Sequence, residues 1–344
     1  MAEEKLADIA EKYNVSIDEI KKENSDVRFF KAFLGSEYVA AMQSLKIPIP
    51  KVYEIPPKQG NSIPEGKFIP NARYRCSQSN LILIDGKSNF SCEIKTQYLF
   101  SILEKKETQF KSIELEDYVT AIEPKNMQDA FDMIKRIELL RNNIIFTNTE
   151  DKIEKIHNIG TLQKDWELFS KHKINSLHFF KELQERNPQS IREFISNGDK
   201  EFSNEKQLSE VIDKNLFFHV LLKSLNENLE EYSIVQKSQI FPSIDLKANV
   251  TNSKVTEDEL ATTYRLVGTL EKESIDEKIL QNLYSNMYQP LIKFSYTEFD
   301  FIYRITYIIE NKTGLLKNAN VSIKESVKND YEVITKFELK QVEL

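Results

Sequence analysis

The 344-residue sequence is poor in glycine, proline and cysteine, with eight, ten and two of these residues. Cys76 and Cys92 allow one disulfide but do not require it, and their place in predicted strands favours two small buried side chains. The glycines are too few and too dispersed to form a phosphate-binding loop or a dinucleotide-binding turn. The sequence therefore predicts a chain that folds without covalent cross-links and has no nucleotide-binding motif.

Patterns that carry catalysis or metal binding are also missing. The sequence has no Cys-x-x-Cys, no His-Glu-x-x-His and no Gly-x-Ser-x-Gly. The histidines stand apart from other metal ligands, and we expect them to be solvated or packed on helices: His157, His172, His178 and His219. Carboxylates are abundant, but nothing selects two of them as an acid and base pair. We therefore expect no metal, no cofactor and no catalytic residue, in a protein that is not an enzyme.

Long apolar runs and an excess of positive charge are absent as well. No segment reaches the roughly 18 continuous apolar residues of a membrane span, and the start "MAEEKLADIA" lacks the basic region and apolar core of a signal peptide. The formal net charge is −7, with both signs interspersed, so the surface lacks the positive field that attracts phosphate backbones. We expect no membrane span, no nucleic-acid partner, and a protein that is cytoplasmic or exported by a non-Sec route.

The sequence does contain many bulky core residues, including 21 Phe and 14 Tyr. Half of the ten prolines lie between Pro48 and Pro64, where they exclude regular helix and remove backbone donors from any sheet. We interpret residues 51–72 as a semi-extended, proline-rich linker between a small domain at residues 1–50 and a larger domain at residues 73–344.

The larger domain shows β-type alternation at both ends and helical spacing between them. Residues 73–104 predict a hairpin around Asp85-Gly86, residues 125–230 are mainly helical in pattern, and antiparallel strands return over 231–344. Two strands have an apolar or aromatic face: Phe90, Cys92, Ile94, Thr96 and Tyr98 in the first, and Phe299, Phe301, Tyr303, Ile305, Tyr307 and Ile309 in the second. The pattern is typical of an α+β domain with an antiparallel sheet and a helical middle section.

Two shorter segments of this domain also allow predictions. "ELEDY", residues 114–118, is typical of a solvated helix or turn. Trp166, the only tryptophan, lies at helical spacing from Leu162 and Phe169, which favours a buried core position.

The N-terminal stretch "LADIAEKYNVSIDEIKKEN", residues 6–24, has the spacing of two short helices joined at a tight corner. Such a unit can bind a DNA groove, but its second helix, "SIDEIKKEN", has three carboxylates against two lysines. Carboxylates in the first turn after a Ser16 N-cap fit a helix start rather than a phosphate contact. The unit then ends in "LKIPIP", a short apolar strand closed by proline, instead of a third helix. We therefore do not expect this unit to bind DNA.

The same stretch, followed by "LKIPIP", resembles the LysM module, a small βααβ unit known mainly for binding the N-acetylglucosamine backbone of peptidoglycan and chitin. The resemblance covers residues 1–50, with a degenerate first strand at "MAEEK". It implies helices packed through Leu6, Ile9, Ala10, Ile17 and Ile20, and Asn24 at the end of the second helix. It completes the predicted fold class, an α+β protein in which a LysM-like (β)ααβ unit precedes the larger domain. The partner that it implies is peptidoglycan or a chitin-like glycan.

An apolar insertion separates Asn24 from Leu45, about ten residues longer than the family usually has. Its large side chains lie at helical spacing and predict a third short helix, which would pack against protein rather than sugar. We therefore also predict a protein partner, or docking on the larger domain. The predicted partner-binding residues are Asn24, Phe29, Phe30, Phe33, Leu34 and Tyr38.

A second resemblance concerns the larger domain. "IIFTNTEDKIEKIHNIGTLQKDWELF" and "ENKTGLLKNANVSIKESVKNDYEVITKFELKQV" resemble the curved antiparallel sheets of bacterial envelope proteins of the lipoprotein-carrier type, which hold apolar ligands. The leading functional hypothesis is a non-enzymatic binding or scaffold protein of a bacterial cell envelope or a contractile, type VI-like secretion apparatus. One alternative is a carrier of a hydrophobic ligand in the sheet domain, and the other is a peptidoglycan-acting enzyme or delivered toxin.

Overall fold

The computed structural model describes residues 4–13, 15, 17–25, 27, 30–31, 37–39, 45–46, 58–174, 177, 180–181, 183, 187–226, 231–328 and 330–344. The chain forms two compact units. The small unit holds residues 1–57 and 167–200, and the sheet unit holds residues 58–166 and 201–344.

The small unit begins with the two predicted helices, α1 (Leu6–Tyr13) and α2 (Ile17–Glu23). Short antiparallel strands lie around them in the order β1-β3-β2: β1 (Glu4–Lys5), β2 (Phe30–Lys31) and β3 (Glu37–Val39). The apolar side of the helices forms a small buried core of Leu6, Ile9, Ala10, Val15 and Ile20. The unit also includes a π-helix at Phe169–Lys173 and most of α6 (Pro188–Ser203). The predicted pair of helices joined at a corner is confirmed.

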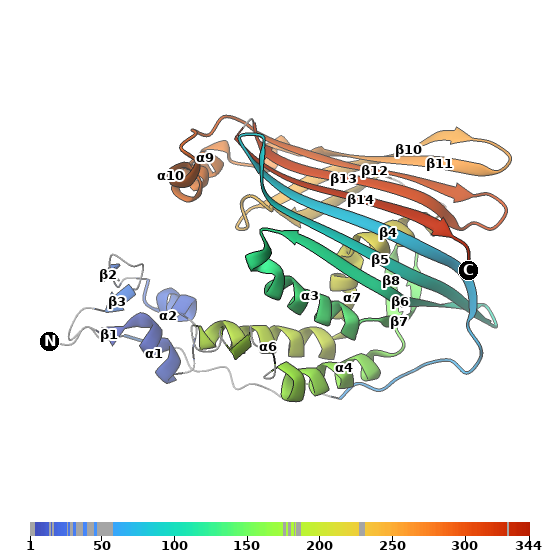
Figure 1. The fold of residues 1–344 in the computed structure, drawn as a ribbon, viewed down its shortest axis with the longest axis horizontal. Coiled ribbons are helices and arrows are strands. Elements are labelled where there is room, and N and C mark those ends of the chain that lie inside the picture. Colours follow the sequence, from blue (N-terminus) through green and yellow to red (C-terminus); the bar gives the residue numbers. More distant parts are fainter. Residues whose placement is uncertain are drawn as a thin grey trace. The chain divides into compact units, whose positions relative to one another are not determined.

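The sheet unit is built on one antiparallel sheet of 11 strands (Figure 1). Five come from the first part of the chain: β4 (Ile69–Ile84), β5 (Lys87–Lys105), β6 (Thr108–Glu123), β7 (Asn143–Thr149) and β8 (Lys152–Ile156). Six come from the last part: β9 (Tyr232–Lys237), β10 (Asp245–Glu257), β11 (Ala261–Leu270), β12 (Phe299–Glu310), β13 (Leu316–Val327) and β14 (Tyr331–Val342).

The strand order is β8-β7-β6-β5-β4-β14-β13-β12-β11-β10-β9. Every pair of neighbours is therefore consecutive in the sequence except β4 and β14. These two strands join a first wing, β4 to β8, to a second wing, β9 to β14. The seam between the wings runs from Tyr331 opposite Ile84 to Val342 opposite Arg73.

The hairpin of β4 and β5 shows how local sequence builds the first wing. Its turn residues Asp85 and Gly86 have φ angles of 50° and 68°. Two positive φ values give the tight turn whose twist matches that of paired strands. The predicted hairpin at Asp85-Gly86 is confirmed.

Several helices lie between the strands of the sheet unit in the sequence. Two of them, α3 (Gln128–Leu140) and α7 (Glu205–Lys214), lie against one face of the sheet, which we call the inner face (Figure 1). Helix α8 (Leu216–Ser224) packs on the same face, where Phe217 stacks on Tyr98 of β5. A fourth, α4 (Ile159–Leu168), carries Trp166, which is 1% exposed and stacks on Phe202 with ring centroids 5.2 Å apart. The predicted core position of Trp166 is confirmed. Helices α9 (Glu277–Met287) and α10 (Gln289–Ile292) connect β11 to β12.

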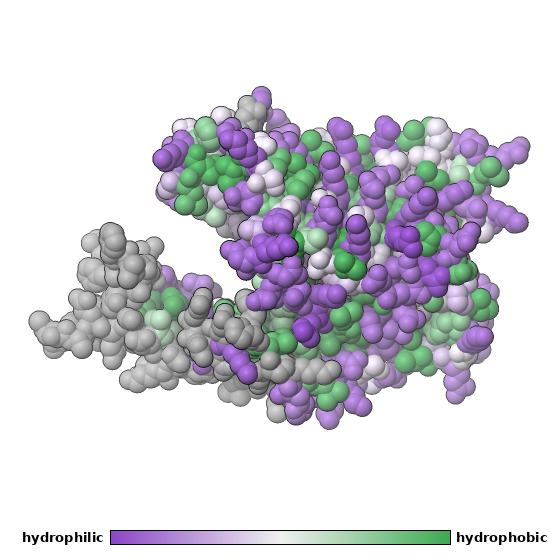
Figure 2. Space-filling model, viewed as in Figure 1, coloured by the Kyte–Doolittle hydropathy of each residue, from purple (hydrophilic) through white to green (hydrophobic). Residues whose placement is uncertain are grey.

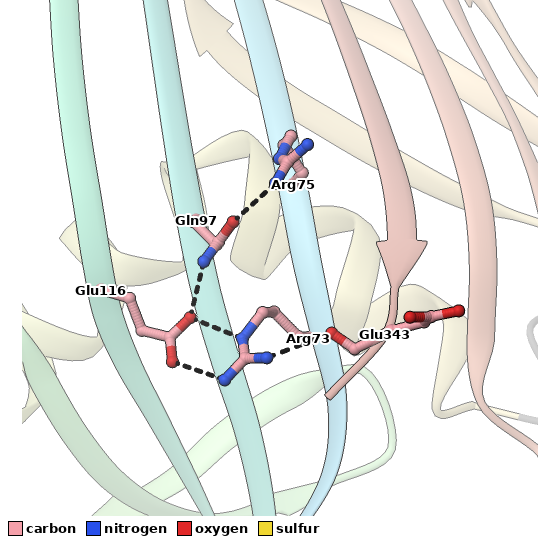
Figure 3. A network of polar contacts seen from close by, with 5 residues as sticks. All are labelled: Arg73, Arg75, Gln97, Glu116 and Glu343. Atoms are coloured by element: carbon pink, nitrogen blue, oxygen red, sulfur yellow. Dashed lines mark hydrogen bonds and ion pairs between the residues drawn. The ribbon is translucent and has the colours of Figure 1, made fainter.

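Alternation along β4 separates the two faces of the sheet. Tyr74 and Cys76 point to the inner face and are buried, whereas Arg73 and Arg75 lie on the outer face. Figure 3 shows the polar network on this outer face. Arg73 donates from Nε and Nη2 to the two carboxylate oxygens of Glu116, at 2.8 and 3.1 Å, and Gln97 bridges Glu116 to Arg75. The network joins β4, β5 and β6 side by side while their other face builds the core.

In the second wing, α8 fills the inner face. The predicted aromatic face of β12 is buried at Phe299, Phe301, Tyr303, Ile305 and Tyr307. Tyr303 meets α8 directly, because its hydroxyl lies 2.7 Å from Nε2 of His219. Phe299 and Tyr307 of the same face pack against the rings of Phe241 and Tyr264, so these side chains are buried against protein.

The predicted fold class is wrong. The dominant element is an 11-stranded antiparallel sheet, not a small LysM-like α+β unit followed by a domain in which sheet and helices are separate sections. Residues 114–118, predicted as a solvated helix or turn, lie in β6, where half-buried Leu115 and buried Tyr118 stand on either side of a bulge at Glu116. The helix predicted after Asn24 is wrong where the chain is described, because Phe30–Lys31 and Glu37–Val39 are strands. The rest of that insertion lies outside the described residues.

Candidate ligand-binding pocket

The inner face of the first wing, α3 and the corner between α7 and α8 enclose a pocket of about 290 Å³. Four neighbouring strands form its floor: Phe337 from β14, Cys76 and Gln78 from β4, Ile94, Thr96 and Tyr98 from β5, and Tyr118 from β6. The register aligns these residues in rows, with Gln78 opposite both Phe337 and Ile94. The floor is therefore continuous across the seam between the two wings.

The walls of the pocket come from helices. Ile134 and Glu138 lie four residues apart on α3, and so on the same side of that helix. The other wall is the α7–α8 corner, where the side chain of Asn215 accepts a hydrogen bond from the backbone N–H of Phe217 at 3.0 Å. The Phe217 ring stacks on Tyr98 with centroids 4.0 Å apart and planes 9° from parallel. This stacking fixes the corner on the floor of the pocket.

Burial keeps the titratable groups of the floor in their neutral forms. It raises the pKa of the Cys76 thiol and of the Tyr98 and Tyr118 hydroxyls far above their ordinary values. The side chain of Thr96 hydrogen-bonds with both Cys76 and Tyr98 and partly opposes these shifts. The floor therefore offers aromatic surface and neutral hydrogen-bonding groups at neutral pH.

Charged groups lie at the edge of the pocket. Arg141 donates to Glu138 at 2.7 Å and to Glu201 at 3.0 Å. Burial raises the pKa of Glu138, and the nearby Arg141 opposes that shift. Lys214, the last residue of α7, is exposed and adds a positive charge to the lining. The edge thus carries both signs, and it favours a ligand whose polar group is neutral or zwitterionic.

A second group of polar side chains is buried where α8 meets the sheet. Lys223 pairs with Asp151, and its Nζ lies 3.9 Å from the centroid of the Tyr232 ring. Burial lowers the pKa of His219 to about 4 and raises the pKa of Asp213 to about 6. None of these side chains lines the pocket. We assign them the structural task of holding α8 against the sheet.

The structure buries both cysteines and His157, leaves His219 half-buried and leaves His172 exposed. Cys76 and Cys92 are free and buried, as the sequence favoured. His219 is packed on a helix, also as predicted, whereas His178 lies outside the described residues. Across the part of the chain that the structure describes, no group of three His, Cys, Asp or Glu side chains is arranged to hold a metal ion. Within the same residues, no helix is both long and apolar enough to cross a membrane.

Of the predicted partner-binding residues, Asn24 is the one whose side chain the structure describes. It is 2% exposed, its Nδ2 donates to the carbonyl oxygens of Ile20 and Lys46, and its Oδ1 accepts from the backbone N–H of Lys46, each at 2.7 Å. Its amide therefore joins α2 to a distant segment of the small unit. The backbones of Phe30 and Tyr38 are paired across β2 and β3. Phe29, Phe33 and Leu34 lie outside the described residues.

The pocket itself was missed by the sequence prediction. The inner-face set of β5 contains three of its floor residues, Ile94, Thr96 and Tyr98, so part of the signal was present. The wall residues of α3 and α7 belong to helices whose position on the sheet has no local sequence signal.

Comparison with known proteins gives little further information. No known family profile matches the chain, and no curated protein is similar to it in sequence. Among solved structures, a chain described as "lipid-protein interactions in lipovitellin" is similar, with a TM-score of 0.37 and 8% sequence identity. The match covers 80% of this chain and 26% of the other, so this chain spans about a quarter of the length of that one. The LysM resemblance stays a prediction.

Proposed function

We propose that the sheet unit is a non-enzymatic carrier of a small amphiphilic ligand, bound in the pocket between the inner face and helices α3 and α7. The observation that supports this most directly is the pocket floor, which combines Tyr98, Tyr118 and Phe337 with the neutral polar groups of Gln78 and Thr96. Concave sites lined by aromatic side chains with a few placed polar groups are the usual form of small-molecule sites.

The chemistry of the floor supports binding rather than catalysis. A thiol or phenol acts as a nucleophile or base in its deprotonated form, and burial disfavours that form at Cys76, Tyr98 and Tyr118. Glu138 is ion-paired with Arg141, so its carboxylate is already engaged.

The volume limits the class of ligand. At about 290 Å³ the pocket is just below the roughly 300–1,000 Å³ that small-molecule sites span. A single short alkyl chain or one ring system with a neutral or zwitterionic polar group fits this volume, whereas a lipid with two long chains does not.

Ligand displacement would test the proposal. The neutral dye N-phenyl-1-naphthylamine would report on the pocket, and a short-chain alkyl glucoside would compete with it. Changing Ile134→Trp adds bulk at a pocket-lining position that is 47% exposed, so the fold should survive the change. We expect this variant to bind the glucoside about tenfold more weakly than the wild type, a loss of about 1.4 kcal/mol.

Leu139→Trp is the matched control, because Leu139 lies on the same helix, is 42% exposed and does not line the pocket. It should bind like the wild type. A wild-type protein that binds no glucoside, or equal loss in the two variants, would show that the pocket is not a ligand site. If the glucoside binds and only Ile134→Trp weakens it, native mass spectrometry of protein purified without detergent would identify the natural ligand.

The glycan and scaffold hypothesis stays a prediction for the small unit. Most of its predicted partner-binding residues lie outside the described residues, and the amide of Asn24 is used within the unit. Pull-down of the full chain with peptidoglycan, comparing the wild type with the Ile134→Trp variant, would test it separately from the pocket.

A further inference from the structure

Most polar groups of the pocket lining are engaged with other groups of the protein. Thr96 hydrogen-bonds with both Cys76 and Tyr98. Asn215 also hydrogen-bonds with Tyr98, and the Glu138 carboxylate accepts from a guanidinium. Figure 2 shows hydrophilic and hydrophobic residues interspersed over the visible face of the sheet unit, which gives no cue to the ligand. Selectivity therefore depends on the few polar atoms of the lining that have no partner.

Gln78, on the pocket floor, has such an atom. Its Nε2 donates to Oδ1 of Asn80 at 3.1 Å, and its Oε1 has no hydrogen-bond partner within the described residues. Along β4 the pocket lining includes Cys76 and Gln78 but ends before Asn80. Because Oε1 and Nε2 lie on opposite sides of one amide carbon, the acceptor Oε1 lies on the side of the pocket.

A contact across the seam fixes the orientation of this amide. Oδ1 of Asn80 also accepts from the Thr335 hydroxyl at 3.0 Å. Thr335 is 7% exposed and lies opposite Asn80 in the pairing of β14 with β4. Turning the Gln78 amide over would place two acceptor oxygens against each other and lose a hydrogen bond. Asn80 and Thr335 are therefore positioning residues, which keep the acceptor side of Gln78 toward the pocket.

The lining has two other polar groups without a hydrogen bond in the part of the chain that the structure describes. The Tyr118 hydroxyl can both donate and accept, so it selects neither donors nor acceptors. The Lys214 ammonium donates only, but it is exposed at the edge of the pocket, where water competes for it. Gln78 is therefore the group of the lining that can distinguish a donor from an acceptor away from water.

We propose that the pocket selects ligands whose polar group is a neutral hydrogen-bond donor, a hydroxyl or an N–H, and that Oε1 of Gln78 accepts this hydrogen bond. The inference rests on the proposed function, because it names the class of ligand that the carrier binds. A ligand with only an ether or ester oxygen would displace water from Oε1 and leave it unpaired. A site that hydrogen-bonds its ligand in this way discriminates against analogues that lack the bonding group.

Two ring systems of the same shape would test this inference on the full chain. Indole has an N–H donor at the position where benzofuran has an acceptor oxygen, and each would compete with N-phenyl-1-naphthylamine. We expect the wild type to bind indole about fivefold more tightly than benzofuran, which is the effect of one neutral hydrogen bond. Changing Gln78→Met keeps the length of the side chain and removes the amide, so the preference for indole should disappear.

The positioning residues provide a second readout in the same ratio of affinities. Thr335→Val removes the hydroxyl and should reduce the preference to about twofold, whereas Thr335→Ser keeps the hydroxyl and should retain about fivefold. A loss of stability alone would weaken both probes equally and leave the ratio unchanged. Gln97→Met is the matched control, because Gln97 lies on the outer face, where it bridges Glu116 to Arg75 (Figure 3). It should show the wild-type preference.

The outcomes separate this inference from the proposed function. Equal binding of indole and benzofuran to the wild type, or a preference that survives Gln78→Met, would overturn the inference and leave the carrier proposal standing. Equal changes in Thr335→Val and Thr335→Ser would show that the Thr335 hydroxyl does not position the amide. If neither ring system nor the alkyl glucoside displaces the dye, the carrier proposal fails and this inference fails with it.

Discussion

Tyr74, on the inner face, makes both a stabilising and a destabilising contribution to the free energy of folding. Its side chain is 0% exposed, and its ring lies 5.8 Å from the ring of Phe217. Its hydroxyl has no hydrogen-bond partner within the described residues. The ring therefore contributes apolar burial, whereas the unpaired hydroxyl costs about 1–3 kcal/mol.

Changing Tyr74→Phe keeps the ring and removes the unpaired hydroxyl. We expect the free energy of unfolding to rise by about 1 kcal/mol, measured by urea denaturation. The comparison variant is Tyr288→Phe, which loses a hydroxyl that donates to Ile240. It should be less stable than the wild type by about 1 kcal/mol. A loss of stability in both variants would mean that the Tyr74 hydroxyl forms a hydrogen bond in the folded protein in solution.

His219 and Asp213 have pKa values shifted in opposite directions. The folded-state pKa of His219 is about 4 against an ordinary 6.5, and burial is the main cause, with Lys223 adding to it. The folded-state pKa of Asp213 is about 6 against 3.8, again mainly through burial, with Asp151 adding to it and Lys152 and Lys223 opposing it. Between pH 4 and 6.5 the unfolded state holds a proton on His219 that the folded state lacks, so stability rises with pH. Between pH 3.8 and 6 the folded state holds a proton on Asp213 that the unfolded state has released, so stability falls with pH.

The two contributions oppose each other between pH 4 and 6 in the wild type, and solvent screening reduces that of Asp213, because its side chain is only partly buried. Changing His219→Gln removes the rising contribution, so its stability should fall relative to the wild type as the pH rises from 4 to 6. Changing Asp213→Asn removes the falling contribution, so its relative stability should rise over the same interval. Urea unfolding at several pH values would measure both slopes. Two variants with the wild-type pH profile would show that neither group titrates as the structure indicates.

At the scale of elements, Glu325 holds the connection between the edge strand β9 and β10. This residue of β13 is 1% exposed, and its carboxylate accepts from the Ser238 hydroxyl at 2.6 Å and from the backbone N–H groups of Gln239 and Ile240. Burial raises the pKa of Glu325, and these donors oppose the shift. One buried carboxylate therefore accepts the hydrogen bonds of the turn that connects β9, at the edge of the sheet, to β10.

Changing Glu325→Gln replaces an acceptor oxygen with an amide that faces backbone N–H donors. We expect a loss of about 1–3 kcal/mol in the free energy of unfolding, and faster hydrogen exchange in β9 than in the rest of the sheet. The matched control is Glu332→Gln in β14, where the partly exposed ion pair with Lys324 is worth about 1 kcal/mol or less. Unchanged exchange in β9 would mean that other contacts hold this turn.

The individual elements were more predictable than their assembly. Helix α3, the β4–β5 hairpin and β12 follow from local periodicity and turn residues, and the structure confirms them. Strand β6 was missed because a bulge at Glu116 breaks the alternation between Leu115 and Tyr118, and polar residues surround both. The break between α7 and α8 was missed because Asn215 caps the second helix within a run that is otherwise helical. The seam pairs Thr335 with Asn80, and pairing over such a separation has no local signal.

At the scale of the whole sheet unit, the seam decides whether the two wings fold as one. Strand β14 pairs with β4 along its whole length, and the pocket floor crosses the same seam at Phe337 and Gln78. Helix α8 packs its residue His219 on β12 of the second wing, while Phe217 of the same helix stacks on Tyr98 of the first. Both the sheet and the helix connect the wings, which predicts a single cooperative unfolding transition.

Gly268 and the single tryptophan allow this cooperativity to be measured. A Cβ atom at Gly268, in the second wing, would lie 3.0 Å from the Tyr303 side chain, so Gly268→Ala should cost about 1–3 kcal/mol through overpacking. Trp166 reports from α4, which follows the strands of the first wing. If the wings unfold together, the urea midpoints measured by Trp166 fluorescence and by far-ultraviolet circular dichroism should both fall by the same amount in the Gly268→Ala variant.

The control is Gly60→Ala, which should leave both midpoints unchanged, because nothing lies within 4 Å of its added Cβ. A Trp166 transition that stays at its wild-type midpoint while the circular dichroism splits into two steps would show that the seam does not couple the wings.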